Sequence, residues 1–190
     1  MKKLTLVAAA SFLMTTAGFS QTWNWDKAHS QLNWNVLHLG VSEIAGSFSS
    51  ATAKITSSKD DFSDAMVELS AEIASISTGN EQRNNHLKSP DFFDAAKYPT
   101  LTFKSTSFKK TGAKTYEVAG DLSFHGVTKP VVLNATLNGT TVNPQSKKTI
   151  AGFKITGVVK RTDFGIATGF PSNMLGDEVH LDANAEFVKD

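Results

Sequence analysis

The chain has 190 residues, a formal net charge of +1 at pH 7 and no cysteine. This length suits one domain with a substantial core, and the lack of cysteine excludes both a disulfide framework and a lipid-modified N-terminal cysteine. Because 19 Lys and Arg nearly balance 18 Asp and Glu, we expect neither nucleic acid nor an anionic lipid surface as the main partner.

The first 20 residues have the pattern of an export signal. Two lysines precede an apolar run over 4–14, which is too short to span a bilayer. Small residues follow and place cleavage near Ser20/Gln21. We therefore expect a signal peptide over 1–20, one domain over 21–190, and a periplasmic or secreted product without stable membrane insertion.

Most of the remaining chain alternates apolar and polar residues, which is the pattern of strands with one buried face. Such segments fall at 32–38, 44–55, 67–76, 101–104, 116–124, 131–138, 153–160 and 179–187. Turn residues separate them. Eight amphipathic strands remove their exposed edges best by closing on themselves. The pattern predicts an all-β protein with short helices, built as an eight-stranded antiparallel barrel. A two-sheet sandwich is the alternative.

The inferred inner face mixes large aromatic side chains with glycine and alanine. An eight-stranded barrel can be filled by side chains or can hold one small ligand. Small residues inside strands often mark the close approach of a ligand, but they also pair with large residues in a close-packed core. The pattern alone leaves both a hollow and a filled barrel open.

The stretch 78–94 reads TGNEQRNNHLKSPDFFD and interrupts the strands. Asn80 is a suitable N-cap for a helix over 81–87, and Ser89-Pro90 resembles the start of a second short helical turn. Long ordered connections between strands often act as lids. We expect this stretch to form a helical plug between the third and fourth strands.

Within the plug, Phe92 and Phe93 are expected to cover one mouth of the barrel. Arg83 and His86 lie three residues apart and share a helical face. They could form an acid–base site with a nearby carboxylate. The preferred interpretation is that they bind strand-end carbonyls or carboxylates and hold the plug in place, because no nucleophile motif or metal-ligand cluster accompanies them.

The pattern predicts four further features. His38 is in phase with the apolar face, so it either meets a ligand head group or is a satisfied core histidine. The five histidines lack metal-site spacing, so no metal site is expected. Arg161 and Asp163 are expected to pair at a strand end. Trp23 and Trp25 are placed before the first strand, where they cover the barrel end.

Four stretches together resemble the YceI-like family. They are residues 23–48, 78–105, 116–133 and 152–165. The resemblance implies an extended lipocalin-like barrel that holds a polyisoprenoid chain in an apolar tunnel. Most members of that family are exported, often periplasmic, and some are linked to stress responses. Two departures stand out: Asn84 follows Arg83 where the family usually has Asp, and Trp34 stands where Phe is usual.

The resemblance favours the hollow barrel and non-catalytic binding, transport or storage of an isoprenoid lipid such as ubiquinone, menaquinone or polyprenol. No cofactor is implied, and a homodimer is possible. There are two alternatives. The protein is an enzyme that modifies such a lipid, or it is a stress-response or adhesion factor with a filled barrel. The expected ligand-binding residues are Trp34, Val36, His38, Phe48, Leu69, Ile73, Phe92, Phe93, Phe103, Leu122, Phe124, Leu133, Phe153, Ile155 and Leu181.

Overall fold

The computed structural model describes residues 20–190. The expected signal peptide over 1–20 therefore lies outside the described residues, except for Ser20. The described chain forms one antiparallel sheet of eleven strand segments. These are β1 (Gln21–Trp25), β2 (Gln31–His38), β3 (Ser42–Phe48), β4 (Ala51–Ser57), β5 (Met66–Glu72), β6 (Ile76–Ser77), β7 (Thr100–Lys110), β8 (Thr115–Phe124), β9 (Val127–Val142), β10 (Thr149–Lys160) and β11 (Leu175–Lys189).

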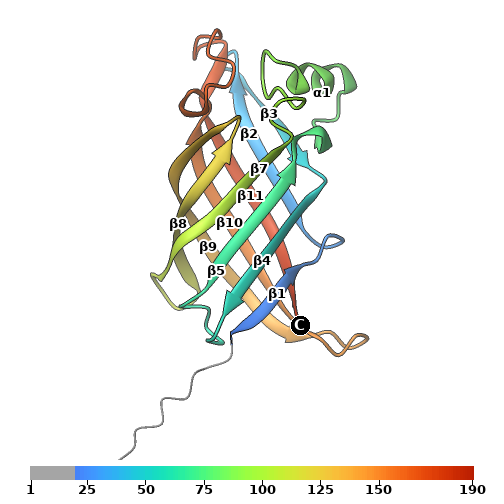
Figure 1. Ribbon diagram of the computed structural model, residues 1–190, viewed down its shortest axis with the longest axis vertical. Helices are drawn as coiled ribbons and strands as arrows, with labels where there is room; N and C mark the ends of the chain where they lie inside the picture. Colours follow the sequence, from blue (N-terminus) through green and yellow to red (C-terminus); the bar gives the residue numbers. More distant parts are fainter. Residues whose placement is uncertain (1–19) are drawn as a thin grey trace, which may run out of the picture.

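The eleven segments make eight barrel strands, because three of the eight are interrupted once. β11 pairs with β2 along its first part and with β1 at its end, and β1 in turn pairs with β4. β3 likewise continues into β4, and β5 continues into β6 after the 3₁₀ turn η1 (Ile73–Ser75). The pairing of β1 with β11 closes the sheet (Figure 1). The predicted eight-stranded antiparallel barrel is confirmed.

The first barrel strand begins earlier than the alternation predicted. Trp23 and Trp25 do not precede it but lie within β1, where Trp23 is opposite Ile55 of β4 and Lys189 of β11. The side chain of Trp23 is buried. The strand was missed because it has only five residues and a break at 26–30 separates it from the longer periodic segment that follows.

The barrel end opposite α1 (Glu81–Lys88) is closed by the loop 58–65 (Figure 1). Phe62 is 1% exposed, and its ring packs 5.1 Å from Trp23 and 5.1 Å from Phe153. The hydroxyl of Tyr116 donates to the carbonyl of Asp61 at 2.6 Å and anchors the loop. We call this end the floor; nothing in the sequence pattern had singled it out.

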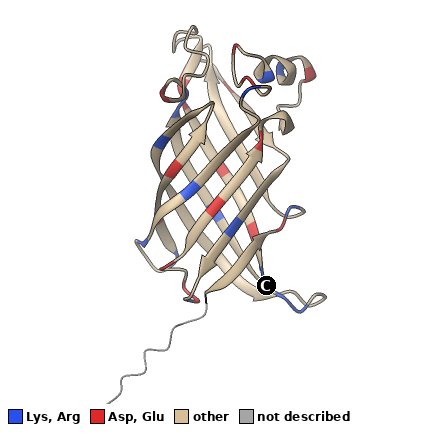
Figure 2. Cartoon of the chain, in the orientation of Figure 1, with Lys and Arg blue, Asp and Glu red and all other residues tan. Residues whose placement is uncertain are grey.

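Charged residues of both signs are interspersed on the outer face of the strands (Figure 2). Glu68 lies between two lysines on adjacent strands, 3.1 Å from Lys104 and 3.9 Å from Lys54. Such exposed pairs add little stability, but the mixed pattern is that of a solvated outer surface. Across the described range 20–190, no helix is both long and apolar enough to cross a membrane.

Candidate functional site

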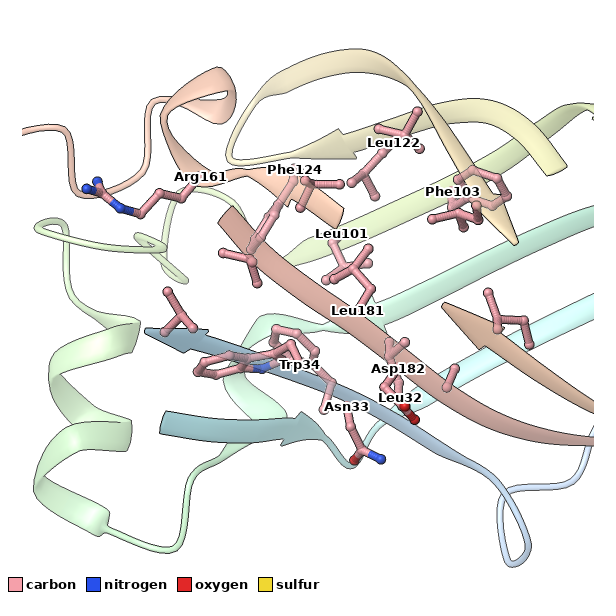
Figure 3. Close-up of a pocket in the computed structure, with 18 of the residues that line it drawn as sticks. Leu32, Asn33, Trp34, Leu101, Phe103, Leu122, Phe124, Arg161, Leu181 and Asp182 are labelled. Carbon is pink, nitrogen blue, oxygen red and sulfur yellow. The ribbon is translucent and has the colours of Figure 1, made fainter. Parts of the chain in front are cut away.

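The barrel encloses an apolar cavity of about 450 Å³. This volume falls within the range of small-molecule pockets, roughly 300–1,000 Å³. Side chains including Trp34 of β2, Phe103 of β7 and Leu122 of β8 converge on it from different strands (Figure 3). Within the described range 20–190, only six of its lining residues carry polar side chains: Asn33, His38, Arg83, His86, Arg161 and Asp182.

Four of the six polar residues gather at one end of the cavity. The remaining two, Asn33 and Asp182, stand opposite each other on β2 and β11, between residues that point inward. The side chain of Asp182 pairs with Lys154 on the outer face of the barrel. The other four, His38, Arg83, His86 and Arg161, come from the end of β2, from α1 and from the first residue after β10. We call this end, covered by the segment 78–99 and the loop 165–174, the upper end.

The predicted ligand-binding residues line this cavity with one exception. The exception is Ile73, which is fully buried in η1, outside the cavity lining, because the strand ends at Glu72 and the alternation does not continue. Fourteen of the fifteen do line it: Trp34, Val36, His38, Phe48, Leu69, Phe92, Phe93, Phe103, Leu122, Phe124, Leu133, Phe153, Ile155 and Leu181. His38 is exposed at the upper end, so it is not a core histidine.

Three inward glycines lie beneath large side chains of the neighbouring strand. A Cβ atom at Gly46 would come closer than 3.0 Å to the Trp34 ring, and one at Gly120 equally close to Phe103. Gly157 lies against Leu133 in the same way. The small residues therefore match large ones, as in a close-packed core, yet the barrel still encloses a cavity. The two alternatives left open by the sequence are both partly correct.

The helix predicted in the plug is present as α1. The side chain of Asn80 accepts a hydrogen bond from the backbone N–H of Arg83 at 2.9 Å, which is the predicted N-cap. The second helical turn is wrong: Ser89 is the C-cap residue of α1, and the chain then forms hydrogen-bonded turns. These turns, closed by bonds from Phe92 and Asp94 to the Ser89 carbonyl, bring the two phenylalanines over the barrel.

Arg83 holds the start of the plug to the end of β6. Its Nε donates to the Thr78 hydroxyl at 2.9 Å and its Nη2 donates to the Thr78 carbonyl at 2.7 Å. The side-chain oxygen of Asn84 accepts from the N–H and the hydroxyl of the same threonine. The expected strand-end anchor is thus confirmed for Arg83. Asn84 contributes to this anchor as a neutral amide that accepts hydrogen bonds from Thr78, and it forms no ion pair with Arg83.

The two phenylalanines of the plug have different neighbours. Phe93 is buried, with its ring 5.2 Å from Phe124 and 6.4 Å from Phe48. Phe92 is half-buried and lies 5.5 Å from Phe170 of the loop 165–174. Phe93 therefore closes the upper end from within, while Phe92 joins the two covering segments to each other.

His86 does not anchor the plug to the barrel. Its side chain is 55% exposed, its ring packs 4.8 Å from that of Phe92, and its Nε2 lies 3.8 Å from a carboxylate oxygen of Asp91. That separation is longer than a hydrogen bond. Among the described residues, His86 therefore has no hydrogen-bonded carboxylate that would orient its imidazole for acid–base chemistry.

Arg161 organises the second covering segment. This residue begins the 3₁₀ turn η2 (Arg161–Phe164) and is 4% exposed. Its guanidinium donates to five backbone carbonyls, those of Ile166, Ala167, Phe170, Leu175 and Gly176, at 2.5 to 3.1 Å. All five of its N–H donors are used, so it fixes the loop and the start of β11 together.

The predicted pairing of Arg161 with Asp163 is wrong. Among the described residues, no carboxylate lies within 4.0 Å of the Arg161 guanidinium. The neighbouring carboxylate is Asp177, whose pKa is lowered chiefly by the hydrogen bond from the Thr162 hydroxyl at 2.7 Å and to a smaller extent by Arg161. Backbone carbonyls replace the expected counter-charge.

A separate cluster lies at the break between β1 and β2. Asp26, His29 and Glu186 bring their ligand atoms within 4.8 Å of one another, so they are the described residues best placed to hold a cation. The hydrogen bond between Asp26 and His29, 2.9 Å long, lowers the pKa of the carboxyl and raises that of the imidazole. Ser30 also binds the backbone of Glu186, so the cluster fastens the break to β11.

Comparison with known proteins gives consistent matches. The model of the YceI-like domain matches residues 23–187. A UPF0312 protein of Pseudomonas savastanoi pv. phaseolicola is 40% identical over 163 residues, which cover 85% of this chain and 82% of that protein.

Two solved structures resemble the barrel. A Campylobacter jejuni YCEI protein has a TM-score of 0.74 and 29% identity, with 100% of this chain and 99% of that chain covered. A polyisoprenoid binding domain from Saccharophagus degradans, described as implicated in plant cell wall breakdown, has a TM-score of 0.62 and 17% identity, with 88% and 98% covered. At that identity the second likeness is one of fold.

Proposed function

Because the chain belongs to the YceI-like domain family, we propose that it binds an isoprenoid lipid in its barrel, for transport or storage and without chemical change. The ligand is a quinone or polyprenol type lipid. Its tail occupies the apolar cavity, and its head group lies at the upper end, beneath the plug.

The observation that carries this proposal is the cavity itself. About 450 Å³ of space remains inside a barrel whose inward residues are otherwise closely packed, and the polar side chains that face it are confined to one end. Each buried CH₂ of a tail contributes about 0.8 kcal/mol, so hydrocarbon gains affinity along the whole lumen. The floor closed by Phe62 limits how deep a tail can reach.

The ligand class is supported by the comparison with Saccharophagus degradans, whose domain of similar fold is described as polyisoprenoid binding. Export to the periplasm or outside the cell is part of the proposal, supported by the signal-like pattern of residues 1–20. A binding role, in place of an enzymatic one, is favoured by the exposed and unoriented imidazole of His86.

The test is to block the lumen. Val131 and Val132 are neighbours on β9, but Val131 lines the cavity while Val132 is 55% exposed on the outer face. Val131→Trp should abolish the lipid that co-purifies with the wild-type protein, as measured by organic extraction and mass spectrometry. Val132→Trp adds the same side chain outside and should retain it.

The extracted mass distinguishes a quinone from a polyprenol, and native mass spectrometry of the same sample gives the oligomeric state. A wild-type protein that carries no lipid and takes up no labelled isoprenoid would remove the proposal. If Val131→Trp is lipid-free but still supports stress resistance or adhesion as well as the wild-type protein does, the protein acts through its outer surface, as a stress-response or adhesion factor would. Turnover of the bound lipid, lost in His86→Ala, would establish an enzyme instead.

A further inference from the structure

We propose that the head group of the lipid is anionic, a carboxylate or a phosphate, and that Arg83 binds it at the upper end of the cavity. This assignment rests on the proposed binding of an isoprenoid lipid, and within that class it selects a polyprenol derivative with an acidic head group over a neutral quinone or alcohol. The assignment concerns the charge at the upper end of the cavity. It can therefore be wrong even if the protein does bind an isoprenoid lipid.

Arg83 has hydrogen-bonding capacity to spare. A guanidinium carries five N–H donors, and the side chain of this half-buried residue, which lines the cavity, uses one from Nε and one from Nη2 on Thr78. For the other three donors, the described part of the chain supplies no partner. Thr78 holds the planar group in a fixed orientation, and such a fork matches the geometry of carboxylate and phosphate oxygens.

A second cation lies at the same end. Arg161 lines the cavity and is almost fully buried, but all five of its donors are bound to backbone carbonyls. It cannot donate to a ligand. Its charge has no carboxylate within 4.0 Å in the described part of the chain, so it still favours an anion nearby, because charges interact strongly where water is excluded.

The two cationic residues belong to segments that contact each other. Phe92, which follows α1, packs 5.5 Å from Phe170, and the carbonyl of Phe170 accepts a hydrogen bond from Arg161. His38 and His86 line the same end. An anion bound by Arg83 would therefore lie beneath a cover that is built from both cationic segments.

Negative charge does not offset these cations inside the cavity. Of the residues within 20–190 that line it, the one carboxylate is Asp182, which pairs with Lys154 on the outer face. Asp91 lies near His86 but is 77% exposed, and Asp177 offsets part of the charge of Arg161 but lies outside the cavity lining and does not offset Arg83. A neutral alcohol or quinone would leave the charge of Arg83 without a counter-charge, whereas an anionic head group would supply one.

The test compares three ligands with the same C15 isoprenoid tail: farnesol, farnesoic acid and farnesyl phosphate. Delipidated full-length protein is titrated with each below its critical micelle concentration, with intrinsic tryptophan fluorescence or calorimetry as the measurement. Charge-assisted hydrogen bonds predict that at least one anionic ligand binds the wild-type protein roughly 10- to 100-fold more tightly than farnesol. The tighter of the two anions identifies the head group.

Two variants assign this preference to Arg83. Arg83→Met should bring the ratio of anion affinity to farnesol affinity close to one, whereas loss of its two bonds to Thr78 alone would weaken all three ligands by a similar factor and leave that ratio unchanged. Measurable farnesol binding also shows that the barrel is folded. Lys88→Met removes one positive charge from the same helix at a residue outside the cavity lining, and it should leave all three affinities unchanged.

Equal wild-type affinities for the three ligands would overturn the anionic head group, and an equal loss in Lys88→Met would overturn the role of Arg83. Binding of none of the three by folded protein would instead remove the proposed function. The wild-type comparison needs no variant, so the head group is tested even if Arg83→Met does not fold.

Discussion

The indole ring of Trp34 lies across the backbone of Gly46, its partner on the adjacent strand. A Cβ atom at Gly46 would come within 3.0 Å of the ring, so this cross-strand pair fits only because one member has no side chain. Trp34 is 8% exposed and lines the cavity. The pair therefore links the stability of the barrel to the width of its lumen.

Gly46→Ala should destabilise the protein by roughly 1–3 kcal/mol, because the rigid indole must move and the surrounding core is close-packed. Chemical denaturation measures this free energy. Gly139→Ala is the matched control, since Gly139 is also in a strand but a Cβ there meets nothing within 4 Å. Equal effects of the two substitutions would show that the Trp34 contact is unimportant.

Trp34→Phe should widen the lumen at little cost in stability. The smaller ring removes packed atoms, which destabilises the protein. However, the buried indole Nε1–H has no hydrogen-bond partner within residues 20–190, and removing such a donor offsets part of the loss. We expect the affinity for a C20 isoprenol to rise relative to a C15 isoprenol, measured by competition. An unchanged ratio would mean that Trp34 does not limit the ligand.

Arg161→Met should destabilise the protein by about 3–5 kcal/mol, because five backbone carbonyls lose their buried donor at once. Arg161→Lys should not rescue it, since an ammonium offers three donors without the planar fork. Lys160→Met, at the exposed neighbouring position, is the control. Denaturation midpoints compare the three; rescue by lysine would indicate that charge alone matters.

The strands and their inward faces were predictable because alternation with period two reports directly which side is buried. Trp34, Phe103 and Leu181 were assigned to the lumen in this way, and they line it. The α1 helix was also predictable, since Asn80 and the polar run after it are local signals. The predictions of inward-facing residues fail where regular alternation ends, as at Ile73, which follows the end of β5.

The covering segments were harder to predict because long-range contacts determine them. The sequence predicts a carboxylate partner for Arg161, but carbonyls of the loop 165–174 and of the start of β11, up to fifteen residues away, satisfy it. Phe62 sits in a polar run, and nothing local shows that it closes the floor. Its φ of 56° places a bulky residue in the left-handed region, a conformation that tertiary packing must support.

The floor loop should also make the protein sensitive to acid through Asp64. Its carboxylate accepts hydrogen bonds from the Ser57 hydroxyl at 2.6 Å, from the N–H and hydroxyl of Ser58, and from the N–H of Lys59. Burial raises the pKa of this carboxyl, but these hydrogen bonds outweigh it and hold the pKa at about 2. The ionised form is thus the one that stabilises the loop carrying Phe62.

A carboxyl whose pKa is lower in the folded state than its ordinary value of 3.8 contributes stability above that value and loses it as the pH falls toward about 2. Asp64→Asn should therefore cost about 1–3 kcal/mol near pH 6, as expected for bonds to a charged acceptor. The difference from wild type should shrink toward zero between pH 4 and pH 2. Asp60→Asn, at an exposed position in the same loop, should show neither effect. Denaturant unfolding at several pH values measures both, and a difference that stays constant down to pH 2 would show that Asp64 acts through shape and not through charge.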